Sequence, residues 1–547
     1  MERNMPQAFL QHYQLFLTPL SPLHLGSGED YEPTNYVIED GALYAFDPSQ
    51  AALTPLQRNE LLETAKRGDI FAIQRYFKKH GSVFADCAHN VVGVSRALAD
   101  NYQEKLGQVA NRERSGNKVG NNFTIERTAI NPHNHRPYIP GSAFKGCLRT
   151  AVLERLSDGN LSRERIDQRN AIRYESNLLG SFASDGLRLL KTADFMPQGL
   201  VATQIQYATQ IQYATNHKKQ KVVKDGQVVR AKGVTGRRET IQHGQYRAFV
   251  ADCTLQQLLL AHKPHIKQPD KSLPRKPVQP KSLQQLALDA NRYHILRFEA
   301  ENKILADQEL VDPAWLQHTR MLLAELMPQL NRGNIMLVRL GKHGGAESKT
   351  ISGLAQTKTV WLAAQAAGET HGLLPFGWAL IEIDPQSENN ALQDWCRQNS
   401  SHLHDIQAIQ SKLAGRKQAA AAKAAALRAE AEAAEQARIA EAQAEQAAAA
   451  QRAAELEAMN PTERLIADWE ERLQQFDFDS RNDVANSAFF NQMKTAFEQA
   501  VKEFDDNSKQ QIAAAFSFKK LEVIKRGFFV GKREKEIKAI LRQLRGE

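Results

Sequence analysis

Hydrophobic and polar positions alternate in short runs through much of the first half of the chain. The run at 13–20 predicts a strand that leads into a glycine-containing loop at 24–28, because such alternation is typical of a half-buried strand. The stretches 36–44 and 222–229 each place an Asp-Gly pair between two alternating arms. Since Asp-Gly readily adopts the positive φ of a type I′ turn, both stretches predict hairpins.

A short repeat precedes the second hairpin. The hexapeptide Thr-Gln-Ile-Gln-Tyr-Ala occurs twice in tandem, at 203–208 and 209–214. Six residues are too few for a solenoid period, and the alternation favours an extended arm.

A proline-rich stretch separates this region from a second mixture of helices and strands. The segment 263–281 holds five prolines among six basic residues, which predicts a loop or linker because proline cannot donate a backbone hydrogen bond. Beyond it, 313–327 predicts a helix that stops before Pro328, and 334–340 and 378–383 predict strands.

Alanine dominates the segment 417–457, where it makes up 21 of 41 residues. Because alanine is the strongest helix former, we expect one long spacer helix of about 60 Å. Large apolar residues are too few for a leucine-type coiled-coil seam. Asn460 and Pro461 then supply an N-cap and a first-turn proline, which predicts an all-helical tail that ends in a basic helix at 532–545.

Composition sets the broad class of the protein. The chain has 547 residues, 42% hydrophobic and 24% charged, which is enough to build several packed domains. No run approaches the ~18 apolar residues of a membrane span, and the N-terminus lacks a secretory signal, so we expect a cytoplasmic protein with no membrane contact. The patterns divide it into an N-terminal module at 1–262, a Pro/Lys-rich linker at 263–282, a second module at 283–415, a spacer helix at 416–458 and a helical C-terminal domain at 459–547.

Positive charge is concentrated in two short segments. Residues 216–238 carry eight Lys or Arg against one acid, and 263–281 carry six against one, whereas the whole chain has a net charge of +9. Such placement is typical of an anion-binding surface, and a solvated loop is the alternative interpretation.

The segment 136–150 predicts a helix entry that binds anions. Pro140 and Gly141 end an extended run, and Ser142 is placed to cap the helix that follows. Lys145 and Arg149 lie four residues apart, so they share one face near the free N–H groups of the first turn. A capped core helix with exposed basic residues is the alternative.

A glycine-rich stretch at 339–350 is the second candidate for anion binding. Glycines at 341, 344 and 345 allow close approach of a ligand to the backbone, with Lys342, His343 and Lys349 nearby. It is not an ATP-binding P-loop, because the two glycine positions of that motif fall on His343 and Ser348. An ordinary strand connection is the alternative.

Other chemistry is poorly represented in the sequence. The four cysteines lie far apart and form no CxxC pair, so neither a zinc ribbon nor a disulfide scaffold is expected. His133 and His135 have no third ligand at metal-site spacing and indicate a polar turn. We find no GxSxG or HExxH motif and expect no metal or cofactor.

Taken in order, these segments resemble the RAMP proteins of type III CRISPR interference complexes. The most specific match is Pro137-Tyr-Ile-Pro-Gly-Ser-Ala-Phe-Lys-Gly-Cys-Leu-Arg149. The order of motifs is most similar to that of the fifth-subunit family of type III-A (Csm) complexes, over about residues 10–390. The other matching segments are Leu23-His-Leu-Gly-Ser-Gly28, Asn35-Tyr-Val-Ile38, Leu187-Arg-Leu-Leu-Lys-Thr-Ala-Asp-Phe195, Arg339-Leu-Gly-Lys-His-Gly-Gly345 with Ser348-Lys-Thr350, and Pro375-Phe-Gly-Trp378.

The resemblance implies an α+β fold with two ferredoxin-like (RRM-like) modules, to which the spacer helix and helical domain are additions. It implies a non-catalytic scaffold that binds the guide RNA (crRNA), caps the filament at the crRNA 3′ end and supports crRNA maturation and antiviral defence. Its partners would be the crRNA, the paired target RNA, other subunits of the complex and cellular nucleases. The expected RNA contacts are Gly26, Gly28, Gly141, Ser142, Lys145, Arg149, Lys218, Lys219, Lys221, Lys224, Arg230, Lys232, Arg237, Arg238, Gly341, Lys342, His343 and Lys349.

The same resemblance bears on catalysis. In the related filament subunit that cuts target RNA, an aspartate does the cutting, and its position falls on Thr34 here, with Asp30 and Glu32 close by in the sequence. A hydroxyl cannot supply that carboxylate. The alternative is a metal-independent endoribonuclease that processes guide precursors, for which His24 and His343 are the candidate general acid and base.

Overall fold

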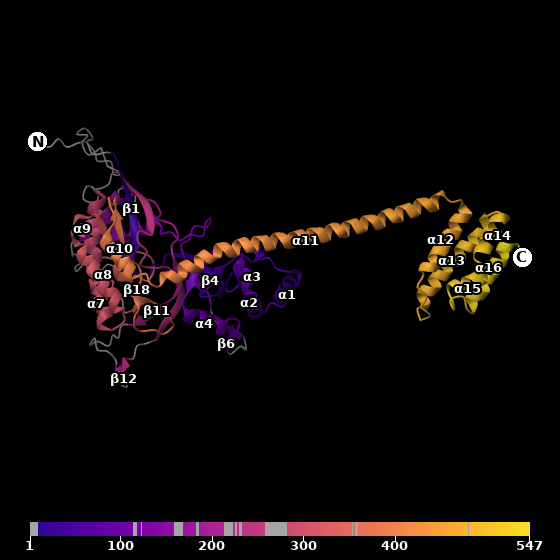
Figure 1. The fold of residues 1–547 in the computed structure, drawn as a ribbon, viewed down its shortest axis with the longest axis horizontal. Coiled ribbons are helices and arrows are strands. Elements are labelled where there is room, and N and C mark those ends of the chain that lie inside the picture. The colour runs from indigo at the N-terminus through magenta and orange to yellow at the C-terminus, as the bar shows by residue number, and fades with distance from the viewer. Residues whose placement is uncertain are drawn as a thin grey trace. The chain divides into compact units, whose positions relative to one another are not determined.

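The chain forms two compact units, 1–427 and 428–547 (Figure 1). Buried hydrophobic clusters lie within each unit, so each has a core of its own. The computed structural model describes residues 9–112, 118–121, 123–157, 168–181, 185–212, 223–224, 227–228, 232–256, 280, 282–352, 354–355, 359–479 and 481–547.

The first sheet of the N-terminal unit is built around β1 (Leu10–Pro19). This strand pairs antiparallel with β15 (Phe249–Gln256) on one side and with β19 (Trp378–Ile383) on the other. Inward-facing Leu15 and Leu17 are fully buried, as the alternation along the strand predicts. The sheet is completed by β9 (Leu190–Thr192), β10 (Met196–Pro197) and β16 (Ile335–Arg339).

The second sheet is built around β11 (Thr203–Gln212). It pairs antiparallel with β14 (Lys232–Ile241) and β17 (Thr359–Ala364), and parallel with β5 (Asn90–Val94). The other strands of this sheet are β2 (Gly26–Tyr31), β3 (Tyr36–Glu39), β4 (Ala42–Ala45), β8 (Ile125–Thr128) and β18 (Leu374–Pro375). Two strand pairs form separate two-stranded sheets: β6 (Val109–Arg112) with β7 (Lys118–Gly120), and β12 (Val223–Lys224) with β13 (Gln227–Val228).

Helix α7 (Leu283–Asp307) connects the helical layer to the first sheet. Its Asn291 side chain donates to the carbonyls of Leu330 and Ile335 and accepts from the N–H of Leu337, each at 2.8 Å. These bonds fix the helix against β16, and α7 to α10 lie along one side of the unit (Figure 1). The remaining helices of the unit are α1 (Pro55–Lys66), α2 (Ile70–Lys79), α3 (Gly81–Asp86), α4 (Arg96–Lys105), α5 (Gly141–Ser157), α6 (Gln168–Leu179), α8 (Pro313–Glu325), α9 (Met327–Arg332) and α10 (Asn390–Gln398).

The alanine-rich helix is longer than the sequence predicts. As α11 (Leu403–Ala458) it spans 56 residues, about 84 Å at 1.5 Å per residue. It begins earlier than expected because its first turns pack on the N-terminal unit, where Leu403 and Leu413 are buried. Arg416 pairs with Glu39 and Asp86 at the same place.

The C-terminal unit is all-helical beyond α11, as predicted. Asn460 caps α12 and forms a capping box with Glu463, as its sequence indicates. The core of the unit gathers aromatic and aliphatic side chains from all five helices. They are α12 (Pro461–Gln475), α13 (Asp483–Glu503), α14 (Asp506–Ala515), α15 (Phe518–Ile524) and α16 (Lys532–Arg545).

The structure confirms the predicted α+β class with two curled sheets and a helical C-terminal region. The first hairpin is confirmed, with positive φ at both Asp40 and Gly41. The division into modules at 1–262 and 283–415 stays a prediction, and both sheets take strands from both segments. Most of the linker at 263–282 lies outside the described residues.

Two local predictions are confirmed with changes. The described part of the tandem hexapeptide, 203–212, is extended as predicted, but it is the central strand of the second sheet and not an arm. The helix predicted at 313–327 starts at Pro313 and ends at Glu325, and a second helix starts at Met327 with Pro328 in its first turn, where proline is tolerated.

Two separate cores predict two separable unfolding steps. Phe528 is fully buried in the C-terminal core, so Phe528→Ala should destabilise that unit by about 3–5 kcal/mol. Scanning calorimetry should show one transition shifted down and the other unchanged. Val523→Ala is the matched control, since Val523 is 79% exposed. A Phe528→Ala protein with both transitions shifted equally would contradict the independence of the cores.

Candidate nucleic-acid interface

The loop at 24–28 and the glycine-rich loop meet at one edge of the first sheet. Strands β1 and β16 both run antiparallel to β19, and both Pro19 and Val338 pair with Ala379. The C-terminal ends of β1 and β16 therefore lie at the same level, and the loops that follow them come together. The N–H of Lys342 donates to the carbonyl of His24 at 2.9 Å, which joins the two loops directly.

Glycine is required at this contact because the two backbones approach closely. Gly341 has φ of +82°, and a Cβ there would lie 2.4 Å from the carbonyl oxygen of His24. A Cβ on Gly26 would lie 2.6 Å from Cε of Lys342. Gly341 therefore sets the backbone contact between the loops, whereas Gly26 leaves room for the end of the flexible Lys342 side chain. Gly28, by contrast, has φ of +84° and open space around it.

The second sheet adds an acid and a cation to the same place. Arg238 on β14 pairs in register with Glu126 on β8, and its guanidinium lies 2.8 Å from Oε1 of Glu126. The Lys342 ammonium lies 3.2 Å from Oε2. Burial disfavours the ionised carboxylate, but the two cations outweigh it and lower the pKa of Glu126. We call His24, Glu126, Arg238, Lys342 and His343 the Glu126 cluster.

The two histidines of the Glu126 cluster are stacked and held neutral. Their ring centroids are 5.9 Å apart, and Nδ1–H of His24 donates to the carbonyl of Glu239 at 2.8 Å. Burial lowers the pKa of His24, and burial together with Arg238 lowers the pKa of His343 to about 3. Neither ring is in the cationic imidazolium form near pH 7, which disfavours a general-acid role for them.

The Glu126 cluster has the chemistry of a pre-organised anion site. Arg238 and Lys342 share one carboxylate within the cluster, so its five side chains have a net charge of one positive while both rings are neutral, and Asp30 also attracts Arg238 from outside the cluster. The Lys342 side chain is 51% exposed, whereas that of Arg238 is 13% exposed. A phosphate can therefore replace Glu126 as the partner of Lys342, and Arg238 supplies a fixed positive charge behind it.

The predicted anion site at 141–149 is occupied by protein groups instead. The N–H of Gly141 donates to Asp194 at 2.8 Å, and a Cβ there would lie 2.4 Å from the carbonyl of Ala193. Lys145 donates to the carbonyl of Leu190 at 2.9 Å. The helix starts at Gly141, so Ser142 lies within its first turn and is exposed, and it is not the cap that we expected.

Arg149 is also bound by the protein itself. It pairs with Asp185 and, at 3.3 Å, with Glu175. The sequence signal at 136–150 thus marks a close approach of α5 to β9. Its role in RNA binding stays a prediction.

The basic arm is described only in part. Lys218, Lys219, Lys221 and Arg230 lie outside the described residues. Lys224 ends β12 and pairs in register with Gln227, and Lys232 begins β14 opposite Ile211. At the base of the arm, the Arg237 guanidinium lies 4.6 Å from the ring centroid of Phe123 and donates to Asn101.

The structure brings together five of the predicted RNA contacts and separates others from them. Gly26, Arg238, Gly341, Lys342 and His343 converge, whereas the residues of α5 contact β9 and its neighbours. Lys349 follows the short 3₁₀ turn at 346–348 and is exposed.

Sequence reasoning missed the residues that complete the site. Nothing in the sequence around Glu126 marks it as the acid shared by two cations. Trp361 and Phe376 pack against His343, with centroids 4.9 and 5.2 Å away. Phe376 lies in the Pro375-Phe-Gly-Trp378 motif, so the aromatic residue of this motif was the sequence signal that could have identified it.

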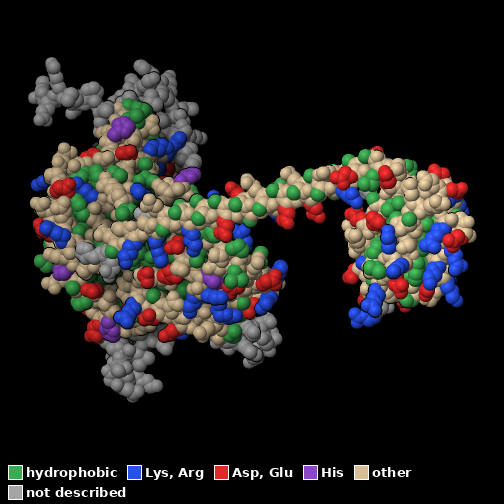
Figure 2. Space-filling view, turned by 45° about the vertical axis from the view of Figure 1, so that its right-hand side comes forward, with side chains coloured by type: hydrophobic (Ala, Val, Ile, Leu, Met, Phe, Trp, Pro, Cys, Tyr) green, Lys and Arg blue, Asp and Glu red, His purple; other side chains and the backbone are tan. Residues whose placement is uncertain are grey.

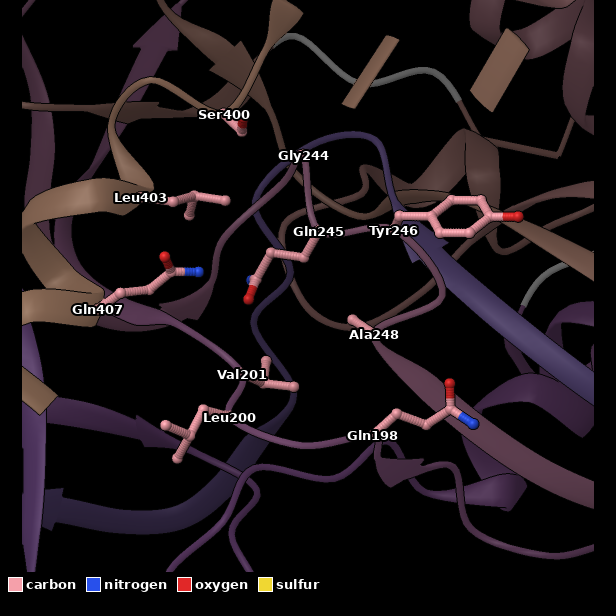
Figure 3. Close-up of a pocket in the computed structure, with 10 residues that line it drawn as sticks. All are labelled: Gln198, Leu200, Val201, Gly244, Gln245, Tyr246, Ala248, Ser400, Leu403 and Gln407. Carbon is pink, nitrogen blue, oxygen red and sulfur yellow. The ribbon is translucent and has the colours of Figure 1, made fainter. Parts of the chain in front are cut away.

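A separate hollow of about 280 Å³ lies beside the start of α11, where Gln198, Gln245 and Gln407 extend from three segments (Figure 3). The Gln245 amide is bound to the backbone of Ala202 in both directions, at 2.7 and 3.0 Å. The Tyr246 hydroxyl accepts from the N–H of Asn389. None of the predicted RNA contacts lines this hollow, and we assign it no ligand.

Neither a metal centre nor a membrane span is found among the described residues. No group of three or more His, Cys, Asp or Glu side chains there is arranged to hold a metal ion. None of the described helices has the length and apolar run needed to cross a membrane.

Gly341→Ala tests the loop contact. It should separate the loops and weaken RNA binding, because the new Cβ would clash with the His24 carbonyl. Gly368→Ala is the matched control, since Gly368 also has positive φ but open space. Filter binding and thermal unfolding of both variants check this. Equal effects on RNA affinity would show that backbone strain alone is responsible.

His343→Asn tests the buried ring through pH. With a folded pKa of about 3 and an ordinary unfolded value near 6.5, the unfolded chain binds the extra proton first. Wild-type stability should therefore fall as pH drops below about 6.5, by up to about 1.4 kcal/mol per pH unit from this ring. Asparagine tolerates the positive φ and does not titrate. Thermal melts at pH 7 and 5 should show a smaller loss in His343→Asn, and an equal loss would refute the assignment.

Comparisons with known proteins give a family match over part of the chain. Residues 16–244 match the model of the RAMP superfamily. No curated protein matches the chain. One solved structure, titled a cryo-EM structure of a Csm–crRNA–target RNA ternary complex in a type III-A CRISPR-Cas system, is matched at 15% identity and TM-score 0.39, covering 68% of this chain and all of that one. A crystal structure of T. onnurineus Csm5 is matched at 15% identity and TM-score 0.40, covering 67% of this chain and 99% of that one.

The family model takes in the strand and loop at 24–28, helix α5, both long strands of the second sheet and Arg238. Residues 16–244 of this chain are therefore similar to the RAMP superfamily, and this match includes His24, Glu126 and Arg238 of the Glu126 cluster.

Proposed function

We propose that the chain is a guide-RNA-binding subunit of a type III-A (Csm) CRISPR complex, acting in the cytoplasm as a scaffold that caps the filament at the crRNA 3′ end. The observation that carries the proposal is the RAMP superfamily match over 16–244, together with the convergence of its first glycine loop with the loop at 341–343. The crRNA, the paired target RNA and neighbouring subunits are its proposed partners, and cellular nucleases are recruited for crRNA maturation.

The charge of the site supports RNA as the ligand. The Glu126 cluster keeps one excess positive charge, and the basic arm leaves the second sheet from β14, the strand that holds Arg238. Cations on a strand and an adjoining arm can follow a phosphate backbone without reading bases. Binding of this kind tolerates any sequence and weakens with salt, as a subunit that holds a variable guide requires.

The geometry around Thr34 supports a non-catalytic role. Thr34 lies in a turn closed by the N–H of Asn35 donating to the Glu32 carbonyl at 2.9 Å. The Glu32 carboxylate accepts a hydrogen bond from the Thr124 hydroxyl at 3.1 Å. The nearest acid that could replace the missing aspartate is thus already engaged.

A single experiment separates the scaffold from a processing enzyme. Full-length protein and end-labelled guide-precursor RNA are mixed in EDTA over a salt series, and gel-shift and denaturing gels are run together. Salt-sensitive binding with intact RNA is the expected result. Site-specific cutting that disappears in His24→Asn or His343→Asn would overturn the scaffold proposal in favour of a metal-independent endoribonuclease.

Charge reversal tests the basic arm. We expect replacement by glutamate at four lysines of the arm to lower the salt slope of guide binding by about 2.8, because each lost phosphate contact on a single strand lowers it by about 0.7. The four lysines are Lys218, Lys219, Lys221 and Lys224. Filter binding from 50 to 200 mM salt measures the slope. The matched control reverses four exposed cations on α1, α4 and their ends: Lys66, Arg67, Arg96 and Lys105. If both quadruple variants change the slope equally, the arm is not a specific contact.

A further inference from the structure

The helical bundle α12 to α16 is strongly polarised in charge. Residues 459–506 contain eleven acidic and five basic residues, whereas 507–547 contain four acidic and eleven basic ones. The net charge of the bundle is therefore close to zero, but α12 and α13 are acidic, α14 is neutral, and α15 and α16 are basic. In Figure 2 the Lys and Arg side chains of this unit gather toward its right-hand and lower edges.

Two of the four acidic residues in the basic half form ion pairs within the described residues. Glu534 binds Lys538, and Glu536 binds Lys494 at 3.1 Å and Lys532 at 3.7 Å. Six exposed cations remain, and no ion pair is found for any of them in the described chain. We call these six the basic face: Lys519, Lys520, Arg526, Lys535, Arg542 and Arg545.

Helix stability does not account for the basic face. Arg542 and Arg545 lie in the last turn of α16, where cations favour the helix dipole. Lys519 and Lys520 lie in the first turn of α15, where the dipole disfavours cations. The sequence thus places positive charge where it weakens the local structure, which requires another reason for it.

The composition of the face fits a polyanion better than a protein partner. Protein interfaces have apolar centres and are depleted in lysine, yet half of the face is lysine. Phe528 and Phe529, the aromatic residues between α15 and α16, are buried, so they cannot stack on bases. One hollow of this unit is lined by residues of α12 and α13 and by none of the six cations of the basic face. A ligand would therefore contact the charged side chains of the basic face and would not insert a side chain into a pocket.

We propose that the basic face binds the phosphate backbone of RNA, as a second contact independent of the Glu126 cluster. The choice of RNA among polyanions rests on the proposed function. Lys535 and Arg542 lie seven residues apart on one side of α16, about 10.5 Å along its axis, so they can contact separate phosphates of one strand. Because no base is read, binding is independent of sequence and decreases with salt.

The test uses the full chain with a 30-nucleotide mixed-sequence RNA that contains 4-thiouridine. The double variant Lys535→Glu/Arg542→Glu should lower the salt slope of RNA binding by about 1.4. The ratio of wild-type to variant RNA affinity should therefore be about sevenfold larger at 50 mM than at 200 mM salt. Crosslinked peptides identified by mass spectrometry should include 518–545 in wild type and lose them in the variant. Arg481→Glu/Lys502→Glu, the matched control on the acidic half, should behave as wild type.

The crosslink map separates this proposal from the proposed function. Crosslinks in both 1–427 and 518–545 support both, and crosslinks in 518–545 alone support the basic face while refuting RNA binding by the sheet unit. Crosslinks confined to 1–427, with an unchanged slope in Lys535→Glu/Arg542→Glu, would overturn the basic face. The protein could also form a salt-sensitive dimer that Lys535→Glu/Arg542→Glu abolishes, with no RNA crosslinks in 518–545. That result would overturn RNA binding by the basic face and would show that the face binds the acidic half of a second copy.

Discussion

The N-terminal unit depends on one strand that is hydrogen-bonded along both edges. Strand β1 pairs with β15 on one side and β19 on the other, so the start of the chain and the segment near 380 form a single sheet. Because β16 also pairs with β19, the ends of β1 and β16 lie at one edge. The contact between Lys342 and His24 follows from this pairing. Without β1 in the middle, the two glycine loops would have no common edge.

The Glu126 cluster shows how a binding site can be kept ready at moderate cost. Removing Arg238 from water without a partner would be unfavourable, and Glu126 supplies that partner in the free protein. One carboxylate against two cations leaves the site attractive to phosphate. The neutral rings of buried His24 and half-buried His343 pack beside it without adding charge.

The C-terminal unit is stabilised by contacts that are more local than those of the N-terminal unit. Its core is built by local helix packing, and the alanine-rich α11 has almost no apolar face to bury, so its helicity comes from residue propensity. The polarised charge of α12 to α16 adds no evident stability to the bundle. A unit that folds by local contacts can carry such a surface because its core does not depend on it.

The sequence by itself determined the local elements. Alternation placed β1 and β19, Asp40-Gly41 gave the hairpin, and alanine content gave α11, because each of these signals acts over a few residues. Only the tertiary structure decided what those elements contact. The sequence marked Lys145 and Arg149 as anion ligands, but Leu190, Asp185 and Glu175 occupy them. Glu126 carried no signal, because its importance arises from pairing between β8 and β14, strands that are far apart in the chain. Long-range pairing sets which charges meet, and no local pattern encodes it.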